Sequence, residues 1–456
     1  MCRQWKFIGQ NEQGTFVMNL TDLQAFRVVA CDLNGQMRGK VVPGAYADKL
    51  ASGAVRMPLS VLNIDIWGAD IEGSPLVFET GDADGMLFPT ERGAMPTPWL
   101  ETPSALVPMA LSQDDGTPFA GDPRHALALV LKQYEARGWQ VVTATEMEFT
   151  LVNDSREIPT PPNDPRNGLP LDGAEILSMS QMDAFAAFFD DLYAGAAEMG
   201  IPVETATSEA GVGQFEVTMK HGPAMQAADN AWLFKTLVRG LARQHGMAAT
   251  FMAKPYADDA GNGMHVHFSV LDAAGHNVFD DGGPKGTDTL RHAVAGCLAA
   301  MPASSLIFAP HGNSYERLVE GAHAPTSAAW GYENRTVAIR IPGGPSAARR
   351  IEHRTAGGDI NPYLLLSAVL GAAMIGVSDQ MTPSAPVTGN AYDTADLPKL
   401  ATDWASAVDM FETDPLIARI FNSLLIYNLV RCKRQEIEKF DQISADTHWR
   451  TLLERV

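Results

Sequence analysis

The feature that most constrains this chain is a strand pattern with carboxylates on one side, first seen in TATEMEFTLV at residues 143–152. Strand side chains alternate between two faces, so Glu146 and Glu148 share one face while Met147 and Phe149 share the other. Such a pair on a single strand most often faces solvent. If it lines a cleft instead, the two carboxylates repel each other and need a cation, because buried unpaired charge is costly.

The same alternation recurs in four later segments. Their polar faces carry Gln214, Glu216 and Thr218 in GQFEVT; His265, His267 and Ser269 in GMHVHFSV; Arg340 in RTVAIRIP; and Arg350, Glu352 and Arg354 in RRIEHR. Glu209 precedes Glu216 across a Gly-rich turn, and Arg335 begins RTVAIRIP. Each strand alone would be an ordinary exposed face. One antiparallel sheet that contained all five would gather five Glu, two His and four Arg, with no Lys, on one surface.

This set of residue types favours a particular chemistry. Carboxylates with one or two imidazoles suit a hard divalent cation such as Mg²⁺ or Mn²⁺, and the lack of Cys ligands argues against structural zinc. Arginines beside such ions suit phosphate and carboxylate groups. The pattern therefore predicts metal-dependent phosphoryl transfer on a sheet-lined cleft, without the GxxxxGK[ST] loop of P-loop enzymes, which does not occur.

The first part of the chain predicts a small β-rich domain. A length of 456 residues suits two domains, or one large domain with an appendage. Residues 26–42 contain two β-prone runs around Asn34-Gly35, which predicts a hairpin. PLSVLNIDIW at 58–67 predicts another strand. Prolines between residues 89 and 123 then predict a connection, and we place the domain boundary near residue 119.

Helices are predicted beyond that boundary. Asp122-Pro123 predicts the start of a helix that stops at Gly138, immediately before the strand with the two glutamates. Residues 181–200 predict one helix with an apolar face, after a loop at 159–173. The apolar run at 364–377 follows Asn361-Pro362 like a core helix.

Composition excludes several classes of protein. The chain has 34 basic and 54 acidic residues, a net charge of -20, which argues against a nucleic-acid partner. The first residues contain no apolar signal-peptide region, and the run at 364–377 is shorter than the roughly 20 residues of a membrane span. The four cysteines have no metal-type spacing and no disulfide-framework density. We expect a cytoplasmic protein with free thiols and no membrane partner.

Several longer motifs, in this order, carry a resemblance to a known family. They are DLNGQMRGK, EMEF, EAGVGQFE, FMAKPYADDAGNGMHVHFS, NSYERLV, NRTVAIRIP and RRIEHRTAGGDINPY. The chain resembles the glutamine synthetase superfamily over most of its length. The resemblance implies an α+β fold, with an N-terminal β-grasp domain at 1–118 and a C-terminal catalytic domain at 119–456 around a curved antiparallel sheet backed by helices. It also implies a homo-oligomer, a dodecamer of two hexameric rings with active sites between subunits.

The resemblance also implies roles for individual residues. One metal set is Glu148, Glu209 and Glu216, and the other is Glu146, His265 and Glu352, for two or more Mg²⁺ or Mn²⁺ ions per site. Glu204, His267, Ser269, Arg335 and Arg340 resemble the ATP contacts, and Arg335 is also a catalytic candidate. Gly261, Arg317 and Arg354 resemble the contacts to the amino-acid substrate. The implied reaction is ATP-dependent ligation of the γ-carboxylate of L-glutamate to an amine through γ-glutamyl phosphate.

Two departures fall on the subsite for the amine. Ammonia-using members carry a flap glutamate in a pattern such as RLVPGYEAP, whereas this chain reads RLVEGAHAP and has His323 at that position. The DGSS stretch with the ammonium-site aspartate is missing, and Asp65 is its plausible counterpart. With GQMRGKVVP and PTSAAWGYENRTVAIRIP, these departures resemble the γ-glutamylpolyamine and γ-glutamylputrescine synthetase branch. An organic primary amine, such as a polyamine or a small amine, is therefore the expected nucleophile.

Two alternatives remain. The chain could be an ammonia-using glutamine synthetase in which Glu320 or a water replaces the flap acid, or a catalytically silent member with a structural or regulatory role. The second is disfavoured because all six metal-ligand positions are filled. Tyr392 lies in the region where some bacterial relatives are adenylylated, but the surrounding motif is not kept, so we do not expect that regulation.

Overall fold

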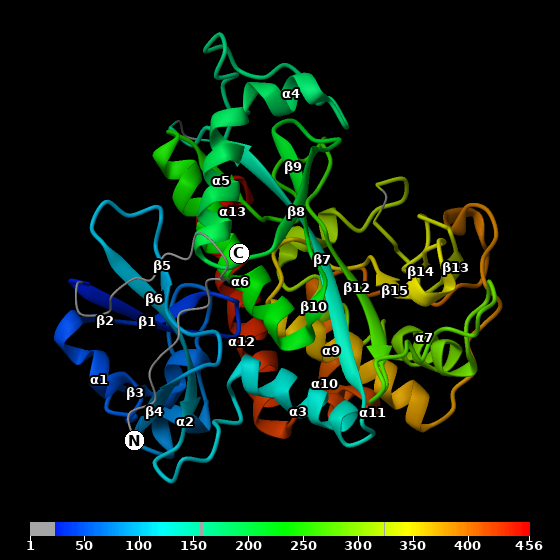
Figure 1. Ribbon diagram of the computed structural model, residues 1–456, viewed down its shortest axis with the longest axis horizontal. Coiled ribbons are helices and arrows are strands. Elements are labelled where there is room, and N and C mark those ends of the chain that lie inside the picture. Colours follow the sequence, from blue (N-terminus) through cyan, green and yellow to red (C-terminus); the bar gives the residue numbers. More distant parts are fainter. Residues whose placement is uncertain (1–22, 156–157, 323) are drawn as a thin grey trace.

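The computed structural model describes residues 23–155, 158–322 and 324–456, and it contains two β-sheets with helices packed around them (Figure 1). One sheet is built from the first part of the chain, and a larger sheet is built from the rest. The helices follow mostly after residue 120 and pack against the larger sheet. The predicted α+β class is confirmed.

The first sheet has six strands in the order β2-β1-β6-β4-β3, with β5 paired to β6. Its strands are β1 (Ala25–Cys31), β2 (Met37–Pro43), β3 (Arg56–Pro58), β4 (Asp84–Pro89), β5 (Met95–Pro96) and β6 (Ser104–Ser112). All pairs are antiparallel except β1 with β6, which run parallel.

The predicted hairpin is confirmed, and it joins β1 to β2. The backbone N–H of Gly35 donates to the Asp32 carbonyl at 3.0 Å, and Gly35 has φ of +80°, which a residue with a Cβ rarely adopts. The Asp32 side chain accepts hydrogen bonds from the N–H groups of Asn34 and Gln36. The turn is therefore fixed by its own local sequence.

The strand predicted at residues 58–67 is wrong. β3 ends at Pro58, and Leu59–Leu62 form a 3₁₀ helix. The alternation in this segment comes from buried polar side chains: Asn63 donates to the Gly121 carbonyl, and Asp65 accepts from the N–H groups of Trp67 and Ala69. Side chains that satisfy nearby backbone groups favour turns over strands.

The second sheet has nine strands in the order β13-β14-β15-β12-β7-β9-β8, with β10 and β11 also paired to β7. Its strands are β7 (Gln140–Val152), β8 (Val203–Ser208), β9 (Gln214–Met219), β10 (Gly222–Pro223), β11 (Ala248–Thr250), β12 (Met264–Leu271), β13 (Trp330–Tyr332), β14 (Ile339–Ile341) and β15 (Ile351–His353). Among the described strands of this second sheet, only β13 and β14 pair in parallel. The expected antiparallel sheet is thus present, and β7 lies at its centre.

Two short helices, α1 and α2, lie beside the first sheet, and the longer helices of the later part of the chain form the layer that packs with the second sheet (Figure 1). They are α1 (Ala47–Leu50), α2 (Pro75–Phe78), α3 (Pro123–Glu135), α4 (Met179–Ala184), α5 (Ala186–Glu198), α6 (Ala224–Gln244), α7 (Asp288–Ala300), α8 (Ser305–Phe308), α9 (Pro362–Ser378), α10 (Trp404–Thr413), α11 (Pro415–Ile420), α12 (Ser423–Phe440) and α13 (His448–Leu452). The predicted starts of α3 and α9 are confirmed, because Asp122 and Asn361 accept hydrogen bonds from the first N–H groups of these helices.

The single helix predicted at 181–200 is instead two helices, α4 and α5. Phe185 separates them with φ of -102° and ψ of 18°, outside the helical region. Its ring is buried and packs edge-on against Phe215 of β9, with ring centroids 5.3 Å apart. This packing against the sheet is a tertiary contact, and the helical periodicity of the sequence does not encode it.

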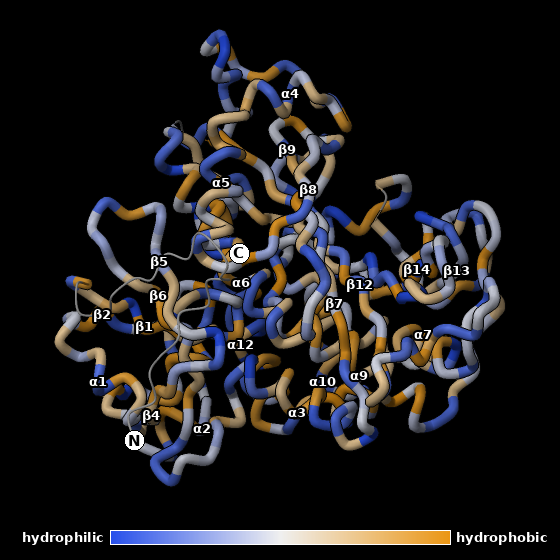
Figure 2. The backbone as a smooth tube through the Cα atoms, viewed as in Figure 1, coloured by the Kyte–Doolittle hydropathy of each residue, from blue (hydrophilic) through white to orange (hydrophobic). Residues whose placement is uncertain are grey.

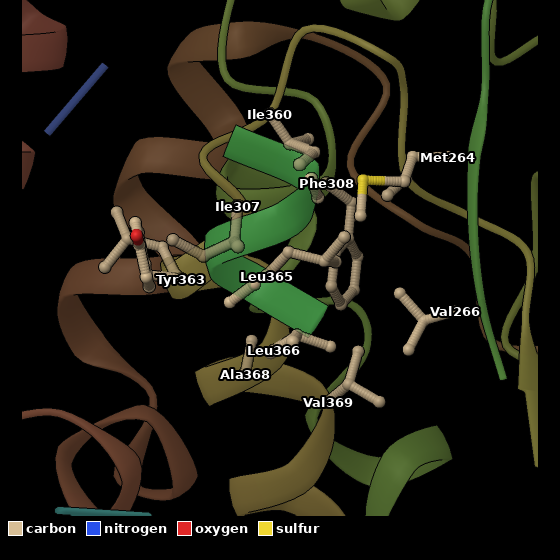
Figure 3. Packing of buried hydrophobic residues seen from close by; sticks show 14 of the residues in the cluster. Met264, Val266, Ile307, Phe308, Ile360, Tyr363, Leu365, Leu366, Ala368 and Val369 are labelled. Carbon is tan, nitrogen blue, oxygen red and sulfur yellow. The ribbon is translucent and has the colours of Figure 1, made fainter. Parts of the chain in front are cut away.

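The main core lies between the second sheet and the helices. Phe149 of β7 is surrounded by the rings of Phe188, Phe215, Phe234 and Phe251, with centroids 5.8 to 6.3 Å away. The hydrophobic stretches in Figure 2 lie in this interior, and the outer loops are largely hydrophilic. Figure 3 shows Met264 and Val266 of β12 beside residues of α8 and α9. One face of the sheet is thus buried, which leaves the other for polar side chains.

The connection between β6 and α3 contains the predicted domain boundary. It runs over residues 113–122, and the Asp122 side chain also accepts from the Leu111 N–H at 3.1 Å. The division at residue 119 stays a prediction. Within the described residues, no helix combines the length and the apolarity needed to cross a bilayer, and Cys31, Cys297 and Cys432 are buried free thiols.

Candidate active site

The polar face of the second sheet carries one continuous row of charged residues across five strands. Glu216 of β9 pairs with Glu148 of β7, and His265 of β12 pairs with Glu146 of β7. His267 of β12 pairs with Glu352 of β15, which in turn pairs with Arg340 of β14. Directly paired positions on one face lie close enough for their side chains to touch. The strand register therefore assembles the surface that alternation alone predicts.

Glu146 is the centre of this row. Its two carboxylate oxygens lie 2.9 Å from His265 Nδ1 and 2.9 Å from His267 Nε2. Potential ligand atoms lie within 4.8 Å of one another in two groups of the described residues, Glu146 with Glu216 and His265, and Glu146 with His267 and Glu352. Both groups offer the oxygen and imidazole ligands that Mg²⁺ and Mn²⁺ accept.

These groups differ from the predicted metal sets. Glu216 lies with Glu146 and His265, and His267, a predicted ATP contact, lies with Glu352. Glu148 accepts hydrogen bonds from the Gly263 N–H at 2.7 Å and from Gln214 Nε2 at 3.2 Å. Glu209 lies close enough to Glu148 for the two charges to interact. The assignment of ligands to individual ions stays a prediction.

The electrostatics of the row indicate an excess of negative charge at one end. Burial and the charges of Glu146, Glu148 and Glu209 together raise the pKa of Glu216 to about 9. Burial and Glu148 together raise the pKa of Glu209 to about 7. The charge of Arg354 opposes the shift at Glu216 but does not offset the repulsion among the carboxylates. Divalent cations would provide further positive charge, so the residues fit the metal ions that the sequence implies.

Neighbouring side chains of the protein stabilise the ionised form of the two other carboxylates, Glu146 at the centre of the row and Glu352 in β15. Burial raises the pKa of Glu146, but hydrogen bonds from His265 and His267 outweigh it and bring the pKa below its ordinary range. Burial also raises the pKa of Glu352, and the charges of His267 and Arg354 bring it below its ordinary value. These two carboxylates are therefore ionised and ready to bind a metal ion.

Two arginines contact the buried Glu352 and still have free N–H groups. Arg340 Nη1 donates to Glu352 at 2.8 Å, and Arg354 Nη1 donates to its other oxygen. Among the described residues, the Nε atoms of Arg340 and Arg354 are buried without a hydrogen-bond partner. A buried N–H that lacks a partner is costly, so these groups suit an anionic ligand.

Gly261, Arg317 and Arg354, the predicted substrate contacts, lie near one another. A Cβ on Gly261 would come within 2.2 Å of the Ala253 carbonyl and 3.1 Å of the Arg317 side chain, so only glycine fits there. Arg317 is buried, donates to the Thr355 carbonyl at 3.0 Å, and interacts electrostatically with Glu148 and Arg354. Burial lowers the pKa of Arg317, because a charged guanidinium is costly away from water. An anionic ligand beside Arg317 would offset this cost.

Several predicted residues lie outside this cluster. Glu204 is exposed at an irregularity in β8, and Arg335 is exposed in the turn between β13 and β14. Ser269 is half-buried on β12, on the face that carries the two histidines. Asp65 is buried, and its carboxylate accepts from Gln435 and Lys439 of α12 as well as from two backbone N–H groups. His323 lies outside the described residues.

Several side chains that the sequence did not single out orient the charged residues of the row. Gln214 Nε2 donates to Glu148, to the Gly261 carbonyl at 2.9 Å and toward Asn262 Oδ1 at 3.1 Å. Arg350 Nε donates to His267 Nδ1 at 3.3 Å. Gln214 and Arg350 lie on the polar face that alternation predicts. The sequence pattern therefore located both side chains, but it did not indicate that they orient the charged residues. Asn262 is a loop residue, and no pattern in the sequence identifies it.

Comparisons with known proteins agree with this geometry. The family described as glutamine synthetase, catalytic domain, matches residues 120–452. γ-Glutamylputrescine synthetase PuuA of Escherichia coli (strain K12) is 34% identical over 430 residues, which cover 92% of this chain and 89% of PuuA. γ-Glutamylethanolamide synthetase GlnA4 of Streptomyces coelicolor is 34% identical over 363 residues, 79% of this chain and 77% of GlnA4. A solved structure of GmaS with ADP has a TM-score of 0.81 and 26% identity, and covers 94% of this chain and 97% of GmaS.

Proposed function

Because the chain belongs to the glutamine synthetase family and is a ligase, we propose that it joins the γ-carboxylate of L-glutamate to an organic primary amine with cleavage of ATP. The observation that carries this proposal is the row of carboxylates and histidines beside Arg340 and Arg354, whose buried Nε–H groups have no hydrogen-bond partner among the described residues. The names of two relatives, which specify γ-glutamylputrescine and γ-glutamylethanolamide as products, support an organic amine as the nucleophile.

The carboxylate row is the proposed site for two or more Mg²⁺ or Mn²⁺ ions. We assign Glu146, Glu148, Glu209, Glu216, His265 and Glu352 to these ions. When bound, such ions polarise phosphate oxygens and neutralise the charge that develops on them. The pairing of Glu146 with two histidines would hold its carboxylate in place, as outer hydrogen bonds commonly do for metal ligands.

The arginines are the proposed contacts for the anionic substrates. Arg340, with Glu204, His267, Ser269 and Arg335, is assigned to ATP. Arg317 and Arg354, with Gly261, are assigned to the carboxylates of glutamate. Positioned guanidinium groups bind phosphate and carboxylate oxygens through two parallel hydrogen bonds. They would hold the γ-carboxylate in line with the terminal phosphate of ATP.

The reaction proceeds in two steps in this proposal. The γ-carboxylate oxygen attacks the terminal phosphorus of ATP, which breaks the bond to the bridging oxygen and gives γ-glutamyl phosphate and ADP. The amine nitrogen then attacks the carbonyl carbon of the acyl phosphate (Cδ of glutamate), the bond from this carbon to the phosphate oxygen breaks, and the amide is formed with release of phosphate and a proton. A carboxylate oxygen is a poor leaving group, and phosphorylation makes it a good one.

The choice of amine is proposed to depend on the segment after Arg317. His323 replaces the glutamate of ammonia-using members, and a neutral imidazole provides no fixed negative charge to concentrate ammonium. Asp65 is the proposed counterpart of the ammonium-site aspartate, although its oxygens already have partners within its own chain. We propose a dodecamer with sites between subunits, located in the cytoplasm and acting in polyamine or small-amine metabolism.

An assay of ADP release tests the proposed function. Purified protein with glutamate, ATP and Mg²⁺ is given single amines, including putrescine, ethanolamine, isopropylamine and ammonium, and ADP is measured. We expect kcat/KM for the best organic amine to exceed that for ammonium by more than about tenfold, and His323→Glu to narrow the gap. If ammonium is the best substrate, the chain is a glutamine synthetase in the strict sense. If no amine stimulates release, the ligase assignment fails for this chain.

A further inference from the structure

A cavity of about 360 Å³ lies between α6 and the hairpin turn of the first sheet. Its walls are residues 35–37 of that turn, the Trp99 indole, one face of α6 and Glu454. None of the described residues assigned to metal, ATP or glutamate lines it, so it is separate from the candidate active site. A volume of this size is sufficient for a small organic molecule.

Two tryptophans give the cavity apolar walls that are held in place. Trp232 is buried, and its Nε1 donates to the Gly35 carbonyl at 2.9 Å, which joins the hairpin turn to α6. Trp99 lies against Gly240, where a Cβ would come within 2.3 Å of the indole Cγ, so only glycine allows this approach. The apolar walls are therefore formed before any ligand binds.

Three cationic side chains of α6 also line the cavity. Lys235, Arg239 and Arg243 are spaced four residues apart and thus share one face of the helix. Arg243 forms ion pairs with Asp154 and Glu454, each at 2.8 Å. The charge of Arg243 is therefore already neutralised.

Lys235 and Arg239 differ from Arg243 because, among the described residues, neither forms an ion pair with a carboxylate. Their hydrogen bonds go to backbone carbonyls, from Lys235 Nζ to Ile360 at 2.8 Å and from Arg239 Nη2 to Val456. The Phe251 ring centroid lies 5.4 Å from Lys235 Nζ and 5.3 Å from Arg239 Cζ, which adds cation–π contacts but no negative charge.

Both cations are costly to bury in this state. Lys235 is 4% exposed, and the Nε of Arg239 is buried with no hydrogen-bond partner among the described residues. Burial lowers the pKa of both groups, and the charge of Arg239 lowers the pKa of Lys235 further. Buried charges in proteins are usually paired, so an anion in the cavity would offset this cost.

We propose that this cavity is a binding site for a small aromatic carboxylate, whose charge contacts Lys235 and Arg239 and whose ring lies against Trp99. Charge-assisted hydrogen bonds from the two cations would hold the carboxylate, and the indole would bury the ring. The ligand would contact both α6 and the turn of the first sheet. This site goes beyond the proposed function and does not depend on it.

Calorimetric titration of the wild-type protein with 2-naphthoate and 2-naphthamide tests the proposal. The two probes share a ring system, but only the acid carries a negative charge. We expect 2-naphthoate to bind at least about tenfold more tightly than the amide, because the amide leaves both cations without a counter-charge. Equal affinities, or no binding of 2-naphthoate, would overturn the proposal.

Variants then locate the bound probe. Lys235→Met and Arg239→Met remove one charge each at similar side-chain length, and each should weaken 2-naphthoate binding by at least about tenfold. Both variants should remain folded because a buried unpaired charge is lost, and circular dichroism checks this. The control is Arg434→Gln on α12, whose arginine is paired with Asp409 and Glu412 and which should leave the affinity unchanged.

Arg354→Lys separates this cavity from the candidate active site. Binding of 2-naphthoate should be unchanged in this variant, because Arg354 does not line the cavity. Affinity that is lost in Arg354→Lys but kept in Lys235→Met and Arg239→Met would place the probe at the predicted glutamate contacts and overturn the proposal.

Discussion

At the residue scale, Glu146 and His265 show how the candidate metal site depends on paired side chains. His265 contacts Glu146, and its ring lies within 4.8 Å of a carboxylate oxygen of Glu216, so its replacement by Ala would remove a proposed ligand and a hydrogen-bond partner of Glu146. We expect His265→Ala and Glu148→Ala each to lower kcat/KM by about a hundredfold or more, with the fold retained. ADP release measures the effect, and far-UV circular dichroism checks the fold. The exposed Glu198→Ala is the control; activity near wild type in either site variant would refute the metal assignment.

Arg354 is a second residue whose shape matters as well as its charge. It donates to Glu352 through Nη1, and its buried Nε has no partner among the described residues, so the rest of the guanidinium is available for a ligand. Arg354→Lys keeps the charge but loses the planar set of donors. We expect the glutamate kcat/KM to fall by at least about tenfold, equivalent to about 1.4 kcal/mol. Unchanged glutamate kinetics would assign Arg354 to structure alone.

At the element scale, Asn361 joins the first sheet to α9. Its Oδ1 accepts from the N–H groups of Tyr363 and Leu364 at the start of the helix, and its Nδ2 donates to the Asp32 carbonyl at 2.8 Å. Asn361→Ala would remove the helix cap and the side-chain hydrogen bond to the Asp32 carbonyl, so we expect a loss of about 2 to 3 kcal/mol in unfolding free energy. Denaturant unfolding measures it. The control is Asp403→Ala at the exposed cap of α10, which should lower the unfolding free energy by only about 1 kcal/mol. Equal losses in the two variants would show that the link from Asn361 to the first sheet contributes little.

At the scale of the whole molecule, stability should depend jointly on pH and on divalent cations. The pKa values of Glu209 and Glu216, about 7 and about 9, lie above their ordinary value of 4.5. In the ion-free protein the folded state therefore keeps protons that the unfolded state has lost, so these groups lower the unfolding free energy as pH rises from about 4.5 to 9. A bound cation favours the ionised carboxylates and opposes that loss.

Thermal unfolding with and without Mg²⁺ checks this linkage. We expect the increase in Tm caused by Mg²⁺ to be larger at pH 8 than at pH 6, because fewer protons must be displaced. Glu216→Gln should reduce the pH dependence of that increase. An increase in Tm that is the same at both pH values would place the binding of Mg²⁺ elsewhere.

The sequence by itself determined which side chains share a face and where several elements begin. Alternation placed Glu146, Glu148 and Glu216 on the polar side of their strands, because the period of a strand is fixed by backbone geometry. Caps at Asp122 and Asn361 and the turn at Asn34-Gly35 were predictable because their hydrogen bonds are local. The family motifs added the expected chemistry.

Only the tertiary structure decided how these pieces meet. The register of five strands placed Glu216 with Glu146 and His265, and that register depends on partners distant in the sequence. Packing against β9 broke the helix at Phe185, and buried polar contacts turned residues 59–62 into a 3₁₀ helix. Tyr392 came beside Ala324 by the same non-local pairing. The physical reason is that local periodicity encodes faces and caps, whereas register and burial follow from contacts between segments that no local pattern specifies.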